Sequence, residues 1–264
     1  MQSSDRVRYA VEDGIALLTL NRPDARNAID DDMRGELMQA IDEAGRDRHV
    51  KALVLTGNGR AFCAGGDIRA MRQRMQAPAG EIAFNGWSRQ QRTHHAVTAL
   101  HSLPKPTIAA VNGASTGLGT DLALACDFVI ASEHASFAWN YVLRGLIPDG
   151  GGMYFLPRRV GMVRAKDLIF SGRTVRLDEA LQLGIADRRS TADALLADAT
   201  AWARALTAGS ATALALAKTI LNQSFELSAE QVFGQGSQAQ GICYTSDEHR
   251  AAVSAFLDKS VRRE

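Results

Sequence analysis

The sequence predicts an α/β protein built from repeated strand–strand–helix units, followed by a helical region. Two observations support this class. Apolar runs of strand length alternate with segments of helical apolar spacing along the first two thirds of the chain. From about residue 190 onward only helical patterns are visible, and residues 192–205 and 211–223 are rich in alanine. This layout suits a spiral α/β core over residues 1–190 with a helical oligomerisation region over 191–264, and a doubly wound sheet is the alternative.

The first 68 residues predict a hairpin, a helix and a third strand. Val7, Tyr9 and Val11 alternate with polar residues, a turn follows at 12–14, and residues 15–20 form a nearly continuous apolar run. Carboxylates at 30–32 then precede apolar residues at helical spacing, as is typical of a helix start. The next apolar run, 50–56, predicts a strand that leads into a glycine-rich turn at 57–68.

The middle of the chain contains a second glycine-rich turn. Residues 69–100 are polar and only loosely periodic, which predicts a helix, a mobile loop and a second helix. Residues 107–111 predict a buried strand, 112–119 a turn and 118–125 a helix. Further strands are expected at 127–131 and 135–138, and helices at 153–160, 164–170 and 177–183.

Composition excludes several classes of function. With 46% hydrophobic and 22% charged residues, a chain of 264 residues can bury a sizeable core. A net charge of +1 gives no basic footprint for nucleic acid or a membrane surface. The three cysteines, Cys63, Cys126 and Cys243, show no paired spacing, which favours a reducing compartment over disulfides or a metal site. Because the sequence shows neither a signal-peptide core nor a membrane span, we predict a cytoplasmic protein.

Three functions compete for the turn at 112–119. A dinucleotide fingerprint needs a third glycine where Leu122 stands. Gly113-Ala114-Ser115-Thr116-Gly117 matches the G-x-S-x-G elbow of serine hydrolases, for which His249 would have to supply the histidine. The third hypothesis is an oxyanion hole, in which one backbone N–H from this turn acts with another from the turn at 57–68. A tight crossover turn with no further role is the plainest alternative.

Five motifs follow one another in an order and spacing typical of one family. They are Leu20-Asn21-Arg22-Pro23 with Asn27-Ala28, then Ala61-Phe62-Cys63-Ala64-Gly65-Gly66-Asp67-Ile68, then Pro106-Thr107-Ile108-Ala109-Ala110-Val111-Asn112-Gly113 with Gly117-Leu118-Gly119, then Cys126-Asp127, and Gly145-Leu146-Ile147-Pro148-Asp149. With them the chain resembles the crotonase (enoyl-CoA hydratase/isomerase) superfamily over essentially its whole length. The resemblance implies a crotonase-like spiral and an acyl-CoA thioester substrate, with no cofactor beyond the coenzyme A part of that substrate.

In this family the thioester carbonyl oxygen binds two backbone N–H groups while it becomes an enolate oxygen. Carried over to this chain, the donors are those of Gly66 and Leu118. By the same resemblance, the adenine and phosphate end of coenzyme A should lie near Arg22, Ala25, Ala64, Asp67 and Ile68. Lys259 is a further candidate, from a neighbouring subunit, while Phe256 is expected in the core or in a subunit contact. The family forms trimers or dimers of trimers, so we expect a homo-oligomer joined through the helical C-terminal region.

Two aspartates are candidates for the chemistry, because proton transfer at carbon favours a carboxylate whose pKa is raised by burial. Asp121 lies three residues beyond Leu118 and matches the first catalytic glutamate of the hydratases. Tyr141 stands where the hydratases have their second glutamate, and a phenol does not replace a carboxylate at neutral pH. Asp149 stands where isomerase-like and dehalogenase-like members carry their catalytic aspartate, although an aspartate there can also cap the helix that follows.

The first functional hypothesis is therefore an enoyl-CoA isomerase in which Asp149 moves a proton between two carbons of the acyl chain. The alternative is an enoyl-CoA hydratase, a lyase in which Asp121 and Asp149 share the placement of water and the protonation of carbon. Trp139 and Tyr141 are expected to shape the acyl pocket. A serine hydrolase acting through Ser115 and a non-catalytic or RNA-binding relative are distant alternatives.

Overall fold

The structure, a computed structural model, describes residues 5–261, with side chains as far as Asp258. Its main sheet has six strands in the order β1-β2-β3-β5-β7-β10, and all neighbours are parallel except the hairpin pair β1 and β2. The strands are β1 (Val7–Glu12), β2 (Ile15–Leu20), β3 (Ala52–Gly57), β5 (Thr107–Val111), β7 (Phe128–Ser132) and β10 (Arg188–Ser190). The predicted hairpin and the strands of this sheet are confirmed up to β7.

A second, smaller sheet consists of β4 (Ala61–Cys63), β6 (Ala114–Thr116), β8 (Ser136–Ala138) and β9 (Thr174–Arg176), in that order. The pairs β3–β4, β5–β6 and β7–β8 each give one strand to each sheet, and helices follow each pair. The predicted spiral of strand–strand–helix units is thus confirmed. Residues 61–63 and 114–116 are strands here, where the sequence predicts glycine-rich turns, because three-residue strands are too short to show a period of two.

Side chains of the six-stranded sheet alternate between two cores. In β3, Leu53 and Leu55 face the larger core, whereas Ala52 and Val54 face the smaller one, as the strand period of two requires. The smaller core is closed by α8 (Leu195–Leu206) through residues such as Trp202. The larger core is closed by α1 (Asp31–Arg46), α3 (Ala79–His101), α4 (Leu118–Ala125), α5 (Gly152–Val160), α6 (Met162–Ser171) and α7 (Leu177–Leu183).

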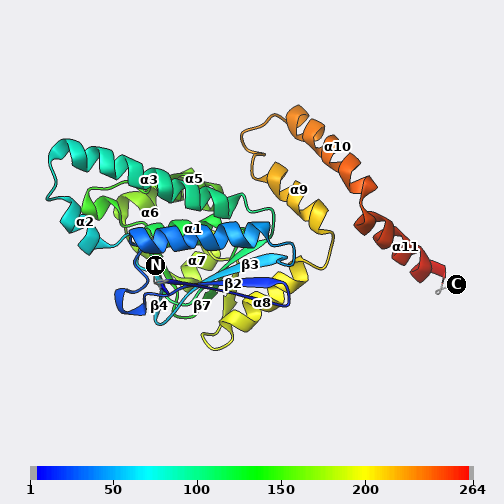
Figure 1. Ribbon diagram of the computed structural model, residues 1–264, viewed down its shortest axis with the longest axis horizontal. Coiled ribbons are helices and arrows are strands. Elements are labelled where there is room, and N and C mark those ends of the chain that lie inside the picture. Colours follow the sequence, from blue (N-terminus) through cyan, green and yellow to red (C-terminus); the bar gives the residue numbers. More distant parts are fainter. Residues whose placement is uncertain (1–4, 262–264) are drawn as a thin grey trace.

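The region predicted as helical from residue 191 begins with α8, which packs on the sheet, and continues as α9 (Ala211–Leu221), α10 (Ala229–Thr245) and α11 (Asp247–Val261). Helix α9 is held by the ion pair of Lys218 with Asp127, whose Nζ and Oδ2 atoms are 2.8 Å apart. Helices α10 and α11 extend away from the body of the molecule (Figure 1). The side chains of Phe233 and Phe256 on these helices are exposed. No helix within the described residues is both long and apolar enough to cross a membrane.

Residues 69–100 also differ from prediction. Helix α2 (Ile68–Arg74) and α3 follow each other with only residues 75–78 between them, so the expected mobile loop is reduced to a short connection. Two 3-10 turns, η1 (Pro23–Ala25) and η2 (Val142–Arg144), complete the fold. Helix α2 and η2 contribute residues to the lining of the candidate site, whereas η1 does not.

Candidate active site

Three segments that are distant in sequence meet at one edge of the four-stranded sheet. Strand β4 is parallel to β6, and β6 is parallel to β8. Because parallel strands end at the same edge of a sheet, the residues that follow them come together there. Gly66 follows β4, Leu118 follows β6, and Tyr141 follows β8. The site is therefore a consequence of strand pairing.

Glycines allow the first two of these segments to touch. A Cβ atom on Gly119, in the first turn of α4, would lie 2.4 Å from the Cys63 carbonyl oxygen, so only glycine lets α4 pack this closely on β4. Gly65 has a φ of +86°, and a Cβ atom there would lie 2.7 Å from the Thr116 carbonyl oxygen and 3.4 Å from the Leu118 nitrogen. The peptide of Gly65 and Gly66 thus lies beside the N-terminus of α4.

The N–H groups of Gly66 and Leu118 have no acceptor among the described residues. Their neighbours are satisfied, since Asp67 N–H donates to Ile29 O at 3.0 Å and Gly117 N–H donates to Ala138 O at 2.8 Å. Both Gly66 and Leu118 line one cavity of about 580 Å³. Two free backbone donors in one cavity can stabilise an oxygen on which negative charge develops.

The wall of this cavity is largely apolar near the two donors. Ile68 and Met71 contribute from α2, and Leu146 and Ile147 contribute from the segment after η2. One face of α3 forms another wall, with residues spaced by three or four along the helix: Ile82, Asn85, Arg89 and Thr93. A cavity of this size and composition can enclose an acyl chain.

Asp149 lines the cavity, as expected of a carboxylate that acts on substrate. It is not a helix cap, because Gly151 occupies the N-cap position of α5. Its Oδ2 atom lies 3.6 Å from Nε2 of His94 on α3, and this is its only ion-pair partner among the described residues. Nε2 of His94 is buried and makes no hydrogen bond in the described structure. The Asp149 carboxylate is therefore free to act on a bound molecule.

Asp121 has the opposite environment. It is completely buried in α4, and its two oxygens accept hydrogen bonds from Trp139 Nε1 at 3.0 Å and from the Tyr141 hydroxyl at 2.6 Å. Burial raises the pKa of Asp121 to about 7, helped by the charge of Asp149 and opposed by both hydrogen bonds. Asp121 does not line the cavity, and Tyr141 lies between them.

The two aromatic residues expected to shape the acyl pocket lie in different places. Tyr141 lines the cavity, whereas Trp139 is fully buried behind it. The expectation for Trp139 is therefore wrong, because its indole turns inward to donate to Asp121. Burial and the adjacent Asp121 raise the pKa of Tyr141 well above its ordinary value, so its hydroxyl stays protonated as a donor.

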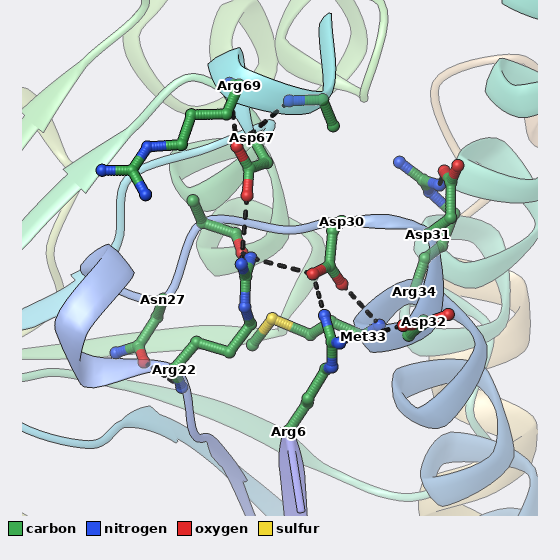
Figure 2. Close-up of polar contacts among 12 residues, drawn as sticks. Arg6, Arg22, Asn27, Asp30, Asp31, Asp32, Met33, Arg34, Asp67 and Arg69 are labelled. Carbon is green, nitrogen blue, oxygen red and sulfur yellow. Dashed lines mark hydrogen bonds and ion pairs between the residues drawn. The ribbon is translucent and has the colours of Figure 1, made fainter. Parts of the chain in front are cut away.

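Figure 2 shows the polar contacts around the residues predicted to bind coenzyme A. Arg22 lies 3.1 Å from Asp67 and 3.2 Å from Asp30, and Asp67 caps α2 by accepting from the N–H groups of Arg69 and Ala70. Of the predicted set, Asp67 and Ile68 line the cavity, whereas Arg22, Ala25 and Ala64 lie outside its lining. The two chain segments still run side by side, since Ala64 N–H donates to Arg26 O at 2.9 Å.

The serine hydrolase hypothesis is contradicted. Ser115 lies in β6 with 1% of its surface exposed, it does not line the cavity, and its hydroxyl has no hydrogen-bond partner in the described part of the chain. His249 lies in α11 and makes an edge-to-face ring contact with Tyr244. The G-x-S-x-G match thus arises from a buried strand followed by a glycine turn. The described residues also hold no group of three or more His, Cys, Asp or Glu side chains suited to a metal ion.

Two further predicted residues lie in α11. The side chain of Lys259 is outside the described residues. Phe256 is 73% exposed in this chain, so it is not part of its core and stays a candidate for a subunit contact.

Sequence reasoning missed His94 and the arginines that line the cavity, among them Arg34, Arg74 and Arg89. A signal for the α3 wall did exist, in the spacing of residues 82, 85, 89 and 93, which places them on one helix face. It was hidden because this helix face carries the polar residues Asn85, Arg89 and Thr93, so it lacks the apolar periodicity used to recognise helices.

Comparison with known proteins agrees with this architecture. The chain matches the enoyl-CoA hydratase/isomerase family over residues 10–262. It is 33% identical over 249 residues to the short-chain-enoyl-CoA hydratase of Clostridium acetobutylicum, covering 94% of this chain and 93% of that protein. It is 35% identical over 249 residues to the 1,2-epoxyphenylacetyl-CoA isomerase of Escherichia coli, covering 94% of each.

Solved structures of related proteins have the same fold. An enoyl-CoA hydratase/isomerase from Cupriavidus metallidurans superposes with a TM-score of 0.89 at 33% identity, covering 98% of this chain and 96% of that one. The fold is thus that of the crotonase class. The chain belongs to the enoyl-CoA hydratase/isomerase family, whose members act on acyl-CoA thioesters.

Proposed function

We propose that this chain is an enoyl-CoA isomerase that moves a double bond along the acyl chain, with Asp149 as the acid and base. This proposal rests on one observation: a single carboxylate in the cavity wall is free of strong bonds to the protein. Of the described residues that line the cavity, only Asp67 and Asp149 carry a carboxylate, and Asp67 is already bonded to Arg22 and two N–H groups. One free carboxylate is sufficient for a proton shift between two carbons of the same substrate.

The proposed reaction begins with the thioester carbonyl oxygen bound to the N–H groups of Gly66 and Leu118. Asp149 removes a proton from C2 of a 3-enoyl-CoA, and the electrons delocalise onto the carbonyl oxygen as a dienolate. Asp149 then returns the proton to C4, which leaves the double bond between C2 and C3. No water is gained or lost. Loss of one oxyanion donor in such a site typically lowers the rate about 10²- to 10³-fold.

Hydration is the second candidate, with Asp121 as the further acid or base. The hydrogen bond between Tyr141 and Asp121 connects this buried carboxyl group to the cavity wall, and a pKa of about 7 would allow it to exchange protons. This route needs a group that places water, and Asp121 reaches the cavity only through Tyr141. Relatives named as hydratases and as an isomerase occur at similar identity, which favours neither reaction.

The test is to incubate the protein in D₂O with a 3-enoyl-CoA and, separately, with a 2-enoyl-CoA, and to follow products by mass. We expect double-bond migration with deuterium incorporation and no added water, lost in Asp149→Asn and kept in Asp193→Asn, an exposed control. Addition of water to the 2-enoyl-CoA would replace the isomerase proposal with the hydratase.

We further propose that the chain is a trimer or a dimer of trimers assembled through the C-terminal helices. Large apolar side chains are exposed along this region, at Leu221, Phe225, Phe233, Tyr244 and Phe256, and burial against another subunit would remove them from water. The proposal requires no cofactor besides the coenzyme A moiety. Sedimentation velocity should give a species of three or six chains, and a monomer at micromolar concentration would contradict this arrangement.

A further inference from the structure

A cluster of arginines in the cavity wall carries more positive charge than its carboxylates balance. Arg34 from α1, Arg74 from α2 and Arg89 from α3 all line the cavity. Arg34 and Arg74 both pair with Asp31, with Arg74 Nη1 3.5 Å from its carboxylate, and no pairing of Arg89 with a carboxylate is seen among the described residues. Burial and the positive charges of Arg74 and Arg34 lower the pKa of Arg89, against the opposing effect of Asp31. Two of these three guanidinium groups thus share one carboxylate, and no carboxylate pairs with the third among the described residues.

Arg34 is built into the wall. Its exposed fraction is 8%, and its Nε–H is buried without a hydrogen-bond partner in the described structure. Buried donors are nearly always paired, and an unpaired one costs free energy. Figure 2 shows Arg34 beside Asp31, with Asp30 between this pair and the Arg22–Asp67 pair. The unpaired donor therefore belongs to a cluster separate from the contacts of Arg22.

We propose that Arg34, Arg74 and Arg89 bind a carboxylate at the distal end of the acyl group, so that the substrate is an enoyl-CoA derived from a dicarboxylic acid. This rests on the proposed function, in which the thioester carbonyl lies at Gly66 and Leu118 in the same cavity. A guanidinium fork matches a carboxylate in shape and charge.

A phosphate of coenzyme A is the other source of an anion for this cluster. The position of Arg34 favours the acyl carboxylate, because a side chain nine-tenths buried is reached only by a small group carried into the cavity. The nucleotide part of coenzyme A is bulky and doubly charged at its diphosphate, so it is better accommodated at an open mouth.

The test measures binding by calorimetry, using two saturated ligands of equal chain length that cannot isomerise. Adipyl-CoA should bind about 10- to 100-fold more tightly than hexanoyl-CoA, as expected for one or two charge-assisted hydrogen bonds. Arg34→Met and Arg89→Met should each remove most of this preference, because the affinity for adipyl-CoA falls far more than the affinity for hexanoyl-CoA. Arg92→Met, an exposed arginine on the same helix that does not line the cavity, should have no effect.

Binding of free coenzyme A and of 3′-dephospho-coenzyme A separates the two anion sources. Equal affinities of wild type and both variants for coenzyme A would agree with the proposal. Weaker binding of coenzyme A and of both acyl-CoA ligands by Arg34→Met and Arg89→Met would assign the cluster to a phosphate and overturn it. Equal binding of adipyl-CoA and hexanoyl-CoA by the wild type would overturn it as well. Because neither ligand reacts, these results are independent of whether the enzyme isomerises or hydrates its substrate.

Discussion

Asp121 and Asp149 lie on two sides of the same wall and differ in almost every physical respect. A Cβ atom on Gly150, the residue after Asp149, would lie 2.8 Å from Oδ2 of Asp121. Asp121 is sealed from solvent with two hydrogen-bond donors, whereas Asp149 faces the cavity beside His94. A raised pKa therefore does not by itself identify the reacting group. Access to the substrate separates the two, and Asp149 has it.

The largest expected effect is a contrast between two matched substitutions, Asp149→Asn and Asp121→Asn. Each replaces a carboxylate by an amide of nearly the same shape. If Asp149 transfers the proton, its substitution should lower kcat/KM about 10²- to 10⁴-fold. The Asp121→Asn variant should lose about tenfold at most, because Asp121 has no contact with the cavity. Steady-state isomerisation of a 3-enoyl-CoA measures both, and equal losses would mean that the buried carboxyl group takes part in catalysis.

Stability should depend on pH through Asp121. Because its pKa rises from 3.8 in the unfolded chain to about 7 in the folded protein, folding favours the protonated form. The stabilisation is complete below about pH 4 and is lost as pH rises through about 7. The free energy of unfolding of the wild type should therefore fall by a few kcal/mol over this window relative to Asp121→Asn. Urea unfolding at several pH values checks this, and parallel profiles would show that Asp121 does not titrate with a raised pKa.

Removal of the Tyr141 hydroxyl should sharpen the difference between the two carboxylates. In Tyr141→Phe the hydrogen bond that lowers the pKa of Asp121 is lost, so that pKa should rise further above about 7. The pH at which the wild type loses stability should move upward in the variant, as measured by the same unfolding series. Activity should fall by less than about tenfold, since the loss of one hydrogen bond costs about 1 kcal/mol. A loss as large as that of Asp149→Asn would instead give the phenol a direct part in the reaction.

The smallest effect is expected at His94, which lies next to Asp149. His94→Leu removes the only ion-pair partner of the Asp149 side chain among the described residues and should lower kcat about 3- to 10-fold with little change in KM. His94→Gln keeps an N–H donor and should recover much of the rate. His95→Leu, at the exposed neighbouring position, is the matched control. An identical loss in the Leu and Gln variants would point to a packing role for His94.

Local structure was predictable wherever short-range chemistry was decisive. The strand at 107–111 and the helix at 118–125 have the predicted bounds, because an apolar β-branched run and a glycine turn specify them locally. The turns that supply Gly66 and Leu118 were likewise visible from their glycines, and the order of the motifs was enough to indicate the family.

The tertiary structure decided which side chains face the cavity. Asp121 and Trp139 are fully buried, whereas Asp149 lines the cavity. This difference follows from tertiary packing around α4 and β8, and no residue pattern encodes it. The arginine wall was also beyond the sequence, since Arg34, Arg74 and Arg89 come from three helices that meet only in the folded chain. The sequence by itself determined the elements, the glycine turns and the family. Only the fold could distinguish a buried carboxyl group from one that reaches a substrate, because burial depends on contacts between residues far apart in the chain.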